Sequence, residues 1–259
     1  MGIFEKLRFG SRKWAQTIAV VEPTRLKNMG LPPQSQDVSE DAAQSVRRDT
    51  FKIRLAHDVS RIREARFLVE KRYGDKGYSL STEAGRPVCP ERITLATYKE
   101  EEVIGTLTIG FDTGAGLLAD ELYKPEIDAL RGDGRRVCEF TKLAIDTKRA
   151  SKRMMAGLFH IAYLYAGRIW GYTDIIIEVN PSHVSFYERM LGFQILGSER
   201  MCPRVGAPAL LLRGETSYGQ RMIRDFGGHP ELARQERTLF PYFMSPDEES
   251  AIIHRMMRG

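Results

Sequence analysis

One carboxylate and four cations within a short stretch offer the most specific chemistry in this sequence. Glu139 stands in the middle of an apolar alternating segment, Val137–Ile145. A carboxylate held on an apolar strand loses solvation, which raises its pKa and suits it to act as a general base. The cations follow directly, at Lys148, Arg149, Lys152 and Arg153. Such a cluster favours a phosphate or an acidic partner, although a merely solvated basic turn has the same composition.

A strand, a turn and a helix must position these groups. One face of the predicted strand takes Val137, Glu139, Thr141, Leu143 and Ile145, and the other takes Cys138, Phe140, Lys142 and Ala144. Ser151 is a candidate N-cap, and apolar residues then recur at helical spacing. Because an unpaired buried carboxylate is costly, Glu139 either takes a substrate proton or pairs with an arginine such as Arg66. Thr141 either orients substrate or carboxylate, or simply fills the strand.

The rest of the pattern predicts an α/β fold with a mixed sheet. Strands are expected at 50–56, 92–98, 103–111, 137–145, 173–179, 194–201 and 209–213, and helices at 57–73, near 117–130, from 151, and within 180–193. Residues 1–48 read as an extension and linker, 49–215 as the main domain, and 216–259 as a helical extension packed on the core. A short N-terminal helix with Phe4, Leu7 and Trp14 would dock on the core or contact a membrane peripherally, and we favour docking.

Composition limits the class of protein. Hydrophobic residues are 42% and charged residues 28% of the chain, as is ordinary for soluble domains. No apolar run approaches the roughly 20 residues of a membrane span, and the N-terminus lacks the apolar core of a signal peptide, so we expect a cytoplasmic protein. Cys89, Cys138 and Cys202 are too few and too far apart to predict disulfides or a metal site. The net charge of +5 favours an acidic partner without choosing one.

A family resemblance narrows this choice. The block NPSHVSFYERMLGF, residues 180–193, resembles the last conserved motif of the GNAT acyltransferase superfamily, in which an Asn, a helix-borne Tyr and a Leu-Gly-Phe ending recur. The segment CEFTKLAID is similar to a strand of acyl-homoserine-lactone synthases, and RFLVEKRYGDKGY, residues 66–78, to their arginine-bearing N-terminal segment. Residues 180–213 resemble the long-chain N-acyl amino acid synthase family. The order of elements over residues 50–213 matches the superfamily.

The resemblance implies a GNAT-type central sheet, mixed and mostly antiparallel, flanked by helices, with two parallel strands that splay apart at a cleft. Acetyltransferases of this kind hold the coenzyme A pyrophosphate on a glycine-rich turn at a helix N-terminus. The matching turn here, TKRASKRMM, has no glycine, and its side chains crowd that approach. The departure favours an acyl-phosphopantetheine donor on acyl carrier protein, with Lys148, Arg149, Lys152 and Arg153 meeting the acidic carrier or the arm's phosphate.

The resemblance also implies catalytic roles. Glu139 would take a proton from the amine of an amino acid acceptor, with Thr141 beside it. A backbone N–H near Leu143 or Ala144 would polarise the thioester carbonyl as an oxyanion hole. Tyr187 would protonate the leaving thiolate, or it is a packed helix tyrosine.

Binding roles follow in the same way, each with an alternative. Arg66 would bind the acceptor carboxylate, or it pairs with Glu139 or Glu70. Asn180 would fix its turn rather than touch substrate. Met154, Met155 and Phe159 would line an acyl tunnel, or they belong to the hydrophobic core.

We therefore predict an N-acyltransferase that moves a fatty acyl group from acyl carrier protein to the amine of a free amino acid. Direct attack is expected because Cys138 faces away from Glu139. We expect no bound cofactor, no metal and no nucleic acid partner. Two alternatives stay open. A coenzyme-A-dependent GNAT N-acetyltransferase is disfavoured by the missing glycines, and a degenerate GNAT-fold binding module by the retained Glu139 and Tyr187.

Overall fold

A computed structural model describes residues 17–21, 50–78 and 91–258. Its centre is an eight-stranded sheet in the order β1-β2-β3-β4-β5-β6-β8-β7. The strands are β1 (Ala19–Val21), β2 (Phe51–Leu55), β3 (Arg92–Lys99), β4 (Glu102–Phe111), β5 (Val137–Ile145), β6 (Asp174–Val179), β7 (Gln194–Cys202) and β8 (Ala207–Glu215). β5 and β6 are parallel, and every other neighbouring pair is antiparallel. The predicted mixed, mostly antiparallel sheet is confirmed.

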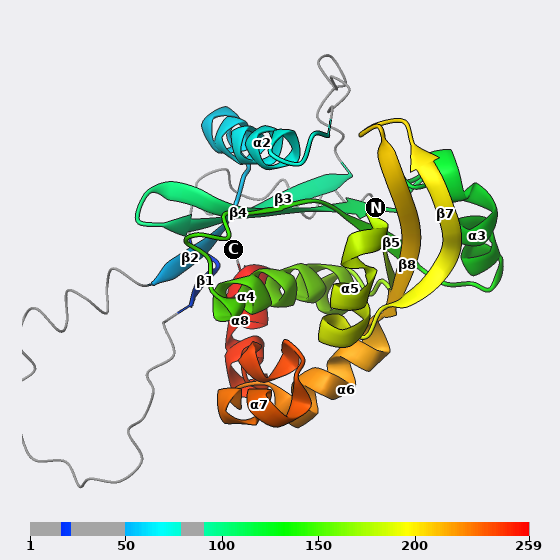
Figure 1. The fold of residues 1–259 in the computed structure, drawn as a ribbon. Helices are drawn as coiled ribbons and strands as arrows, with labels where there is room; N and C mark the ends of the chain where they lie inside the picture. Colours follow the sequence, from blue (N-terminus) through cyan, green and yellow to red (C-terminus); the bar gives the residue numbers. More distant parts are fainter. Residues whose placement is uncertain (1–16, 22–49, 79–90, 259) are drawn as a thin grey trace, which may run out of the picture.

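Helices cover both faces of this sheet (Figure 1). The α-helices are α2 (Val59–Gly74), α3 (Asp120–Gly132), α4 (Lys152–Tyr163), α5 (Val184–Leu191), α6 (Thr216–Phe226), α7 (Ala233–Glu236) and α8 (Pro246–Arg258). A π-helical turn, η1 (Leu164–Ile169), extends α4, and short 3-10 turns are η2 (Pro181–His183), η3 (Pro230–Leu232) and η4 (Phe240–Tyr242). Figure 1 shows α2 on one face, α4 with the C-terminal helices on the other, and α3 beside β7. No helix in the described ranges is long and apolar enough to cross a membrane.

Local sequence explains where key helices begin and end. Ser151 caps α4, because its Oγ accepts the backbone N–H of Met154 at 3.1 Å. Ser245 and Glu248 form a reciprocal capping box before α8, with N–O distances of 2.8 and 3.3 Å. Gly192 ends α5 in the left-handed conformation that glycine adopts without strain. The predicted cap at Ser151 is confirmed.

Apolar residues form a main core on the α4 side and two smaller clusters on the opposite side. The main core includes Met154, Leu158 and Ile161 of α4 and receives Ile223 and Ile252 from the C-terminal helices. On the other face, one cluster joins α3 to the sheet through Tyr123, Ile127, Val137, Ile176 and Leu211, and another joins α2 through Leu68, Val69 and Ala144. These clusters show which face each strand residue occupies.

One strand lies in the segment expected to be linker. β1 pairs antiparallel with β2, and a Cβ added at Gly157 of α4 would lie 2.8 Å from Val21 Cγ2, so glycine permits the close approach of helix and strand. Three residues are too short for an alternating pattern to predict a strand. The helix expected around Phe4, Leu7 and Trp14 lies outside the described residues.

β5 contains a bulge that the predicted alternation missed. Lys142 and Leu143 together oppose Leu107 of β4, and Lys142 has a φ of +51°. The extra residue inverts the pattern after it. Leu143 and Ile145 pack on the main core, and Ala144 packs under α2. The expectation that Leu143 and Ile145 share a face with Glu139 is therefore wrong.

Candidate active site

β5 and β6 separate beside Glu139. They pair at only three positions, Val137–Asp174, Cys138–Ile175 and Glu139–Ile176, and then separate. Beyond Glu139, the β5 edge that faces β6 has no strand partner among the described residues. The bulge at Lys142 lies on this open segment, where the backbone N–H of Leu143 or Ala144 was expected to polarise a carbonyl. The predicted splayed parallel strands are confirmed.

Glu139 is a buried carboxylate with an incomplete set of partners. Its side chain lies on the face of Val137 and Ile176, and the residue is 1% exposed. Oε2 accepts the backbone N–H of Ala119 at 3.1 Å, and Oε1 lies 3.5 Å from Nη2 of Arg92. Oε1 accepts no hydrogen bond within the described part of the chain. Burial raises the pKa of Glu139 more than the Leu118 and Ala119 N–H groups and Arg92 lower it.

Arg92, and not Arg66, is the arginine beside Glu139. Arg66 is exposed on the outer face of α2, and its Nε donates to Glu70 at 2.6 Å. Of the two ion-pair partners offered as alternatives for Arg66, Glu139 is wrong and Glu70 is found. Arg92 reaches the carboxylate because it opposes Gly110 of β4, which in turn opposes Glu139. The proximity of Arg92 to Glu139 depends on the register of three strands. Local sequence patterns do not fix that register, so sequence analysis missed Arg92.

Two further polar residues lie just beyond the point where the strands separate. Thr141 and Glu178 each lie two residues beyond the last paired positions, Glu139 and Ile176, and on the same face of the sheet. Thr141 Oγ1 and Glu178 Oε1 are buried, and neither makes a hydrogen bond among the described residues. The other oxygen of Glu178 accepts from Arg204. Sequence analysis missed Glu178, although a carboxylate inside the apolar run IIIEV was the available signal.

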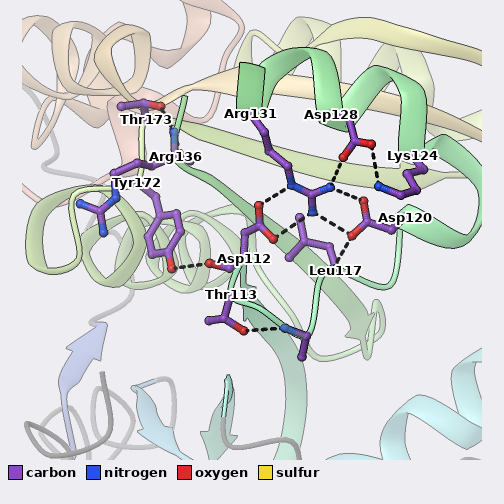
Figure 2. Close-up of polar contacts among 11 residues, drawn as sticks. Asp112, Thr113, Leu117, Asp120, Lys124, Asp128, Arg131, Arg136, Tyr172 and Thr173 are labelled. Atoms are coloured by element: carbon purple, nitrogen blue, oxygen red, sulfur yellow. Dashed lines mark hydrogen bonds and ion pairs between the residues drawn. The ribbon is translucent and has the colours of Figure 1, made fainter. Parts of the chain in front are cut away.

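The loop that donates to Glu139 is fixed by one arginine (Figure 2). Arg131 of α3 donates to Asp112 at 2.7 and 2.9 Å, to Asp120 at 2.8 Å through each of two nitrogens, and to Asp128 at 2.7 Å. Asp120 also accepts the N–H of Leu117 at 2.7 Å. A hollow of about 530 Å³ lies here, lined in part by Asp112, Asp120 and Arg131. Because Arg131 binds these carboxylates, we assign the cluster to holding the loop, not to chemistry.

Glycine at position 110 makes room for the glutamate. A Cβ there would lie 2.7 Å from both Cγ and Oε1 of Glu139. Real Cβ atoms do not approach neighbours so closely, so any larger residue would displace the carboxylate. Gly110 is therefore part of what positions Glu139.

Aromatic side chains surround Tyr187 of α5, which packs against the main core. Tyr187 packs edge-on against Phe159, Phe186 and Phe193, and burial raises its pKa, with a further contribution from Tyr73. Burial raises the pKa of Tyr73 to about 12, and Glu178 contributes. A tyrosine that stays protonated can donate a proton, so the leaving-group role of Tyr187 stays a prediction.

Comparison with known proteins identifies the family. Residues 64–215, from within α2 to the end of β8, match the family model described as "N-acyl amino acid synthase FeeM". The chain belongs to the FeeM family of N-acyl amino acid synthases. It is therefore an N-acyltransferase. No curated protein matches the sequence.

The solved structure of FeeM agrees with this fold, and two further solved structures are less similar. The FeeM structure, an N-acyl amino acid synthase from uncultured soil microbes, has 27% sequence identity and a TM-score of 0.61, covering 64% of this chain and 92% of that one. A putative N-acetyltransferase from Lactobacillus plantarum has 15% identity and a TM-score of 0.47, covering 64% of this chain and 98% of that one. The AHL synthase LasI has 14% identity and a TM-score of 0.46, covering 64% of this chain and 90% of that one.

The cations of the basic turn lie just before α4 and in its first residues. Arg149 pairs with Glu102, whereas Lys148, Lys152 and Arg153 form no ion pair within the described ranges. Asp146, at the end of β5, accepts from Arg72 of α2, which joins α2 to this turn.

The remaining predicted residues are structural or lie apart. Asn180 accepts from Ser182 N–H at 3.0 Å and so fixes its turn, as the preferred alternative stated. The main core takes Met154 and Phe159, with Met155 partly buried against it. Cys138 is buried on the opposite face from Glu139, and burial raises its pKa, so it is a poor nucleophile. Among the described residues no His, Cys, Asp and Glu group could hold a metal.

Proposed function

We propose that the protein transfers a fatty acyl group from acyl carrier protein to the amine of a free amino acid and releases an N-acyl amino acid. The observation that carries this proposal is the buried Glu139, whose Oε1 is free of hydrogen bonds from the described residues where β5 and β6 separate. Membership of the N-acyl amino acid synthase family supports the amine acceptor.

The arrangement supports direct aminolysis of the thioester. Glu139 takes a proton from the acceptor nitrogen, which attacks the thioester carbon. The N–C bond forms and the C–S bond breaks, while a backbone N–H at the bulge, near Leu143 or Ala144, stabilises the oxyanion. Tyr187 returns a proton to the departing thiolate. No acyl-enzyme intermediate is needed, since Cys138 lies on the other face of the sheet.

The composition of the basic turn indicates which acyl donor the protein uses. Its segment 147–155 carries no glycine, so backbone N–H groups are less open to a pyrophosphate than in a glycine-rich turn. Lys148, Lys152 and Arg153 are not neutralised by described residues and suit an acidic protein surface or a single phosphate. These features support a phosphopantetheine arm on acyl carrier protein rather than coenzyme A.

A direct assay tests donor and acceptor together. The full chain is incubated with an equimolar mixture of the twenty common amino acids and either palmitoyl acyl carrier protein or palmitoyl coenzyme A, and amide products are read by mass spectrometry. We expect palmitoyl amino acids from the carrier-bound donor at much the higher kcat/KM. A higher kcat/KM with coenzyme A would replace the proposed donor, and absence of any amide product would overturn the proposed function.

Charge reversal in the basic turn tests the partner. The double variant Lys152→Glu and Arg153→Glu should raise the KM for palmitoyl acyl carrier protein about tenfold or more and leave the KM for the amino acid mixture unchanged. Arg224→Glu on α6, an exposed arginine elsewhere, is the matched control. Equal KM values for wild type and the double variant would contradict docking at this turn.

A further inference from the structure

Three buried polar atoms without hydrogen bonds belong to residues on one face of the sheet, beside the point where the strands separate. Glu139 Oε1, Thr141 Oγ1 and Glu178 Oε1 are all buried and make no hydrogen bond with described residues. Glu139 and Thr141 share one face of β5 before the bulge, and Glu178 occupies that face on β6. Buried polar atoms are nearly always satisfied, so three on one face beside the end of the β5–β6 pairing point to a missing partner.

The chemistry of the three atoms defines that partner. Two carboxylate oxygens accept hydrogen bonds, and a threonine hydroxyl can accept one as well. A primary ammonium group has three N–H donors and one positive charge, which matches this set. A second anion, such as a carboxylate, would be repelled by both glutamates.

We propose that the acceptor enters as an ammonium ion held by Glu139, Thr141 and Glu178, which makes Glu178 an acceptor-binding residue. This inference rests on the proposed transfer to an amine and adds a second carboxylate to it. The acceptor class is then a primary amine that is protonated in solution, with its nitrogen at the point where β5 and β6 separate.

A structural role alone does not account for Glu178. Arg204 binds only its Oε2 and also contacts Glu121 and the carbonyl oxygen of Leu118. A comparable pair nearby is complete, because Arg200 donates to both oxygens of Glu126. The free oxygen of Glu178 is therefore not a general property of the arginine–glutamate pairs on this side of the molecule.

Two carboxylates also suit the proton balance of the reaction. The ammonium nitrogen must lose one proton before it attacks and a second as the N–C bond forms. One proton returns to the thiolate released by C–S cleavage, and one leaves to solvent. The negative charge of Glu178 helps to raise the pKa of Glu139, which favours proton acceptance there.

Steady-state kinetics test the role of Glu178. With palmitoyl acyl carrier protein and the equimolar amino acid mixture, Glu178→Gln should raise the half-saturating amino acid concentration about tenfold or more and leave that of the donor unchanged. Glu126→Gln, which weakens the complete pair, is the matched control and should change neither. A half-saturating amino acid concentration within about twofold of wild type for Glu178→Gln would overturn the inference.

A binding measurement separates this inference from the proposed function. Ethylammonium chloride titrated into wild type should shift the backbone amide NMR signals of Ala119 and Thr141, and Glu178→Gln should largely abolish the shift. Tetramethylammonium chloride, which has the charge but no N–H donor, should give none. Shifts without any acyl transfer would keep the ammonium site and reject the proposed reaction. No shift in wild type would overturn the site itself.

Discussion

Two buried glutamates in this protein have opposite surroundings. Glu249 of α8 is 8% exposed, and both its oxygens are bound, by Arg168 at 2.9 Å and by His160 at 3.3 Å. Glu139 is more deeply buried and keeps one oxygen without a hydrogen bond from the described residues. His160 and Arg168 outweigh burial and lower the pKa of Glu249, whereas burial dominates and raises the pKa of Glu139.

The contrast separates a structural carboxylate, Glu249, from the one that we propose as the general base, Glu139. His160 accepts the N–H of Met244 at Nδ1, at 3.0 Å, so its Nε2 carries the proton given to Glu249. This saturated cluster docks α8 on α4. At Glu139 the fold leaves the carboxylate short of partners and so keeps it ready to accept a proton. Glu139 therefore differs from Glu249 in two ways, deeper burial and one oxygen without a hydrogen bond from the described residues.

Removing the charge of Glu139 should have the largest effect on activity. Glu139→Gln should lower kcat/KM on the order of 10²- to 10⁴-fold, because Gln cannot accept a proton. Stability at pH 8 should not fall, since a buried charge with few partners is removed. Initial rates and urea unfolding midpoints measure both. Near wild-type transfer by this variant would reject Glu139 as the base.

Moving the same carboxylate without removing it should have a smaller effect. Gly110→Ala places a Cβ against Glu139 and should lower kcat on the order of 10- to 100-fold. Gly105→Ala is the matched control on the same strand, because its Cβ would meet only side-chain atoms of Ile145 and Met154, at 3.3 Å and beyond. Equal rates for the two variants would show that the position of Glu139 does not depend on Gly110.

Removing the charge of Glu249 should lower stability and leave activity unchanged, the opposite of the result expected for Glu139. Glu249→Gln should reduce the free energy of unfolding by about 1–3 kcal/mol, because His160 and Arg168 lose a charged partner. Activity per folded molecule should stay close to wild type. The urea midpoint and the rate below the unfolding transition provide the two readings. A large loss of rate in folded protein would give α8 a catalytic part that the structure does not suggest.

As the pH is lowered, acyl transfer should be lost at a somewhat higher pH than the contribution of Glu249 to stability. Glu139 has a raised pKa, so transfer is lost as pH falls through a value above its usual 4.5. Glu249 has a lowered pKa, so its stability contribution is present above 4.5 and is lost only as pH falls through the lower folded value. Activity should therefore fail before Glu249 weakens the fold. Reversible loss of rate with unchanged circular dichroism is the expected result, and coincident transitions would oppose it.

Sequence patterns predicted the local features of this site but not the pairings across the sheet. Alternation bounded β5 and singled out Glu139, and side-chain chemistry located the cap at Ser151. The bulge at Lys142 was missed because it depends on the register with β4. Arg92 was missed for the same reason.

Long-range contacts determine the other features of the two glutamates that sequence patterns did not predict. The partnership of His160 with Glu249 joins residues far apart in the chain, and no local periodicity encodes it. Glu178 was assigned to an internal strand, where its partner Arg204 and its free oxygen depend on tertiary packing. Sequence could therefore predict the fold and single out Glu139, whereas the partners that tune each carboxylate required the structure.

The most direct test is the titration of the two glutamates in one sample. Side-chain carboxyl ¹³C NMR on the full chain, with Glu139→Gln and Glu249→Gln used to assign the signals, gives each pKa separately. We predict that Glu139 titrates above 4.5 and Glu249 below it. A Glu139 pKa at or below that of Glu249 would contradict the assignment of Glu139 as a general base kept short of partners.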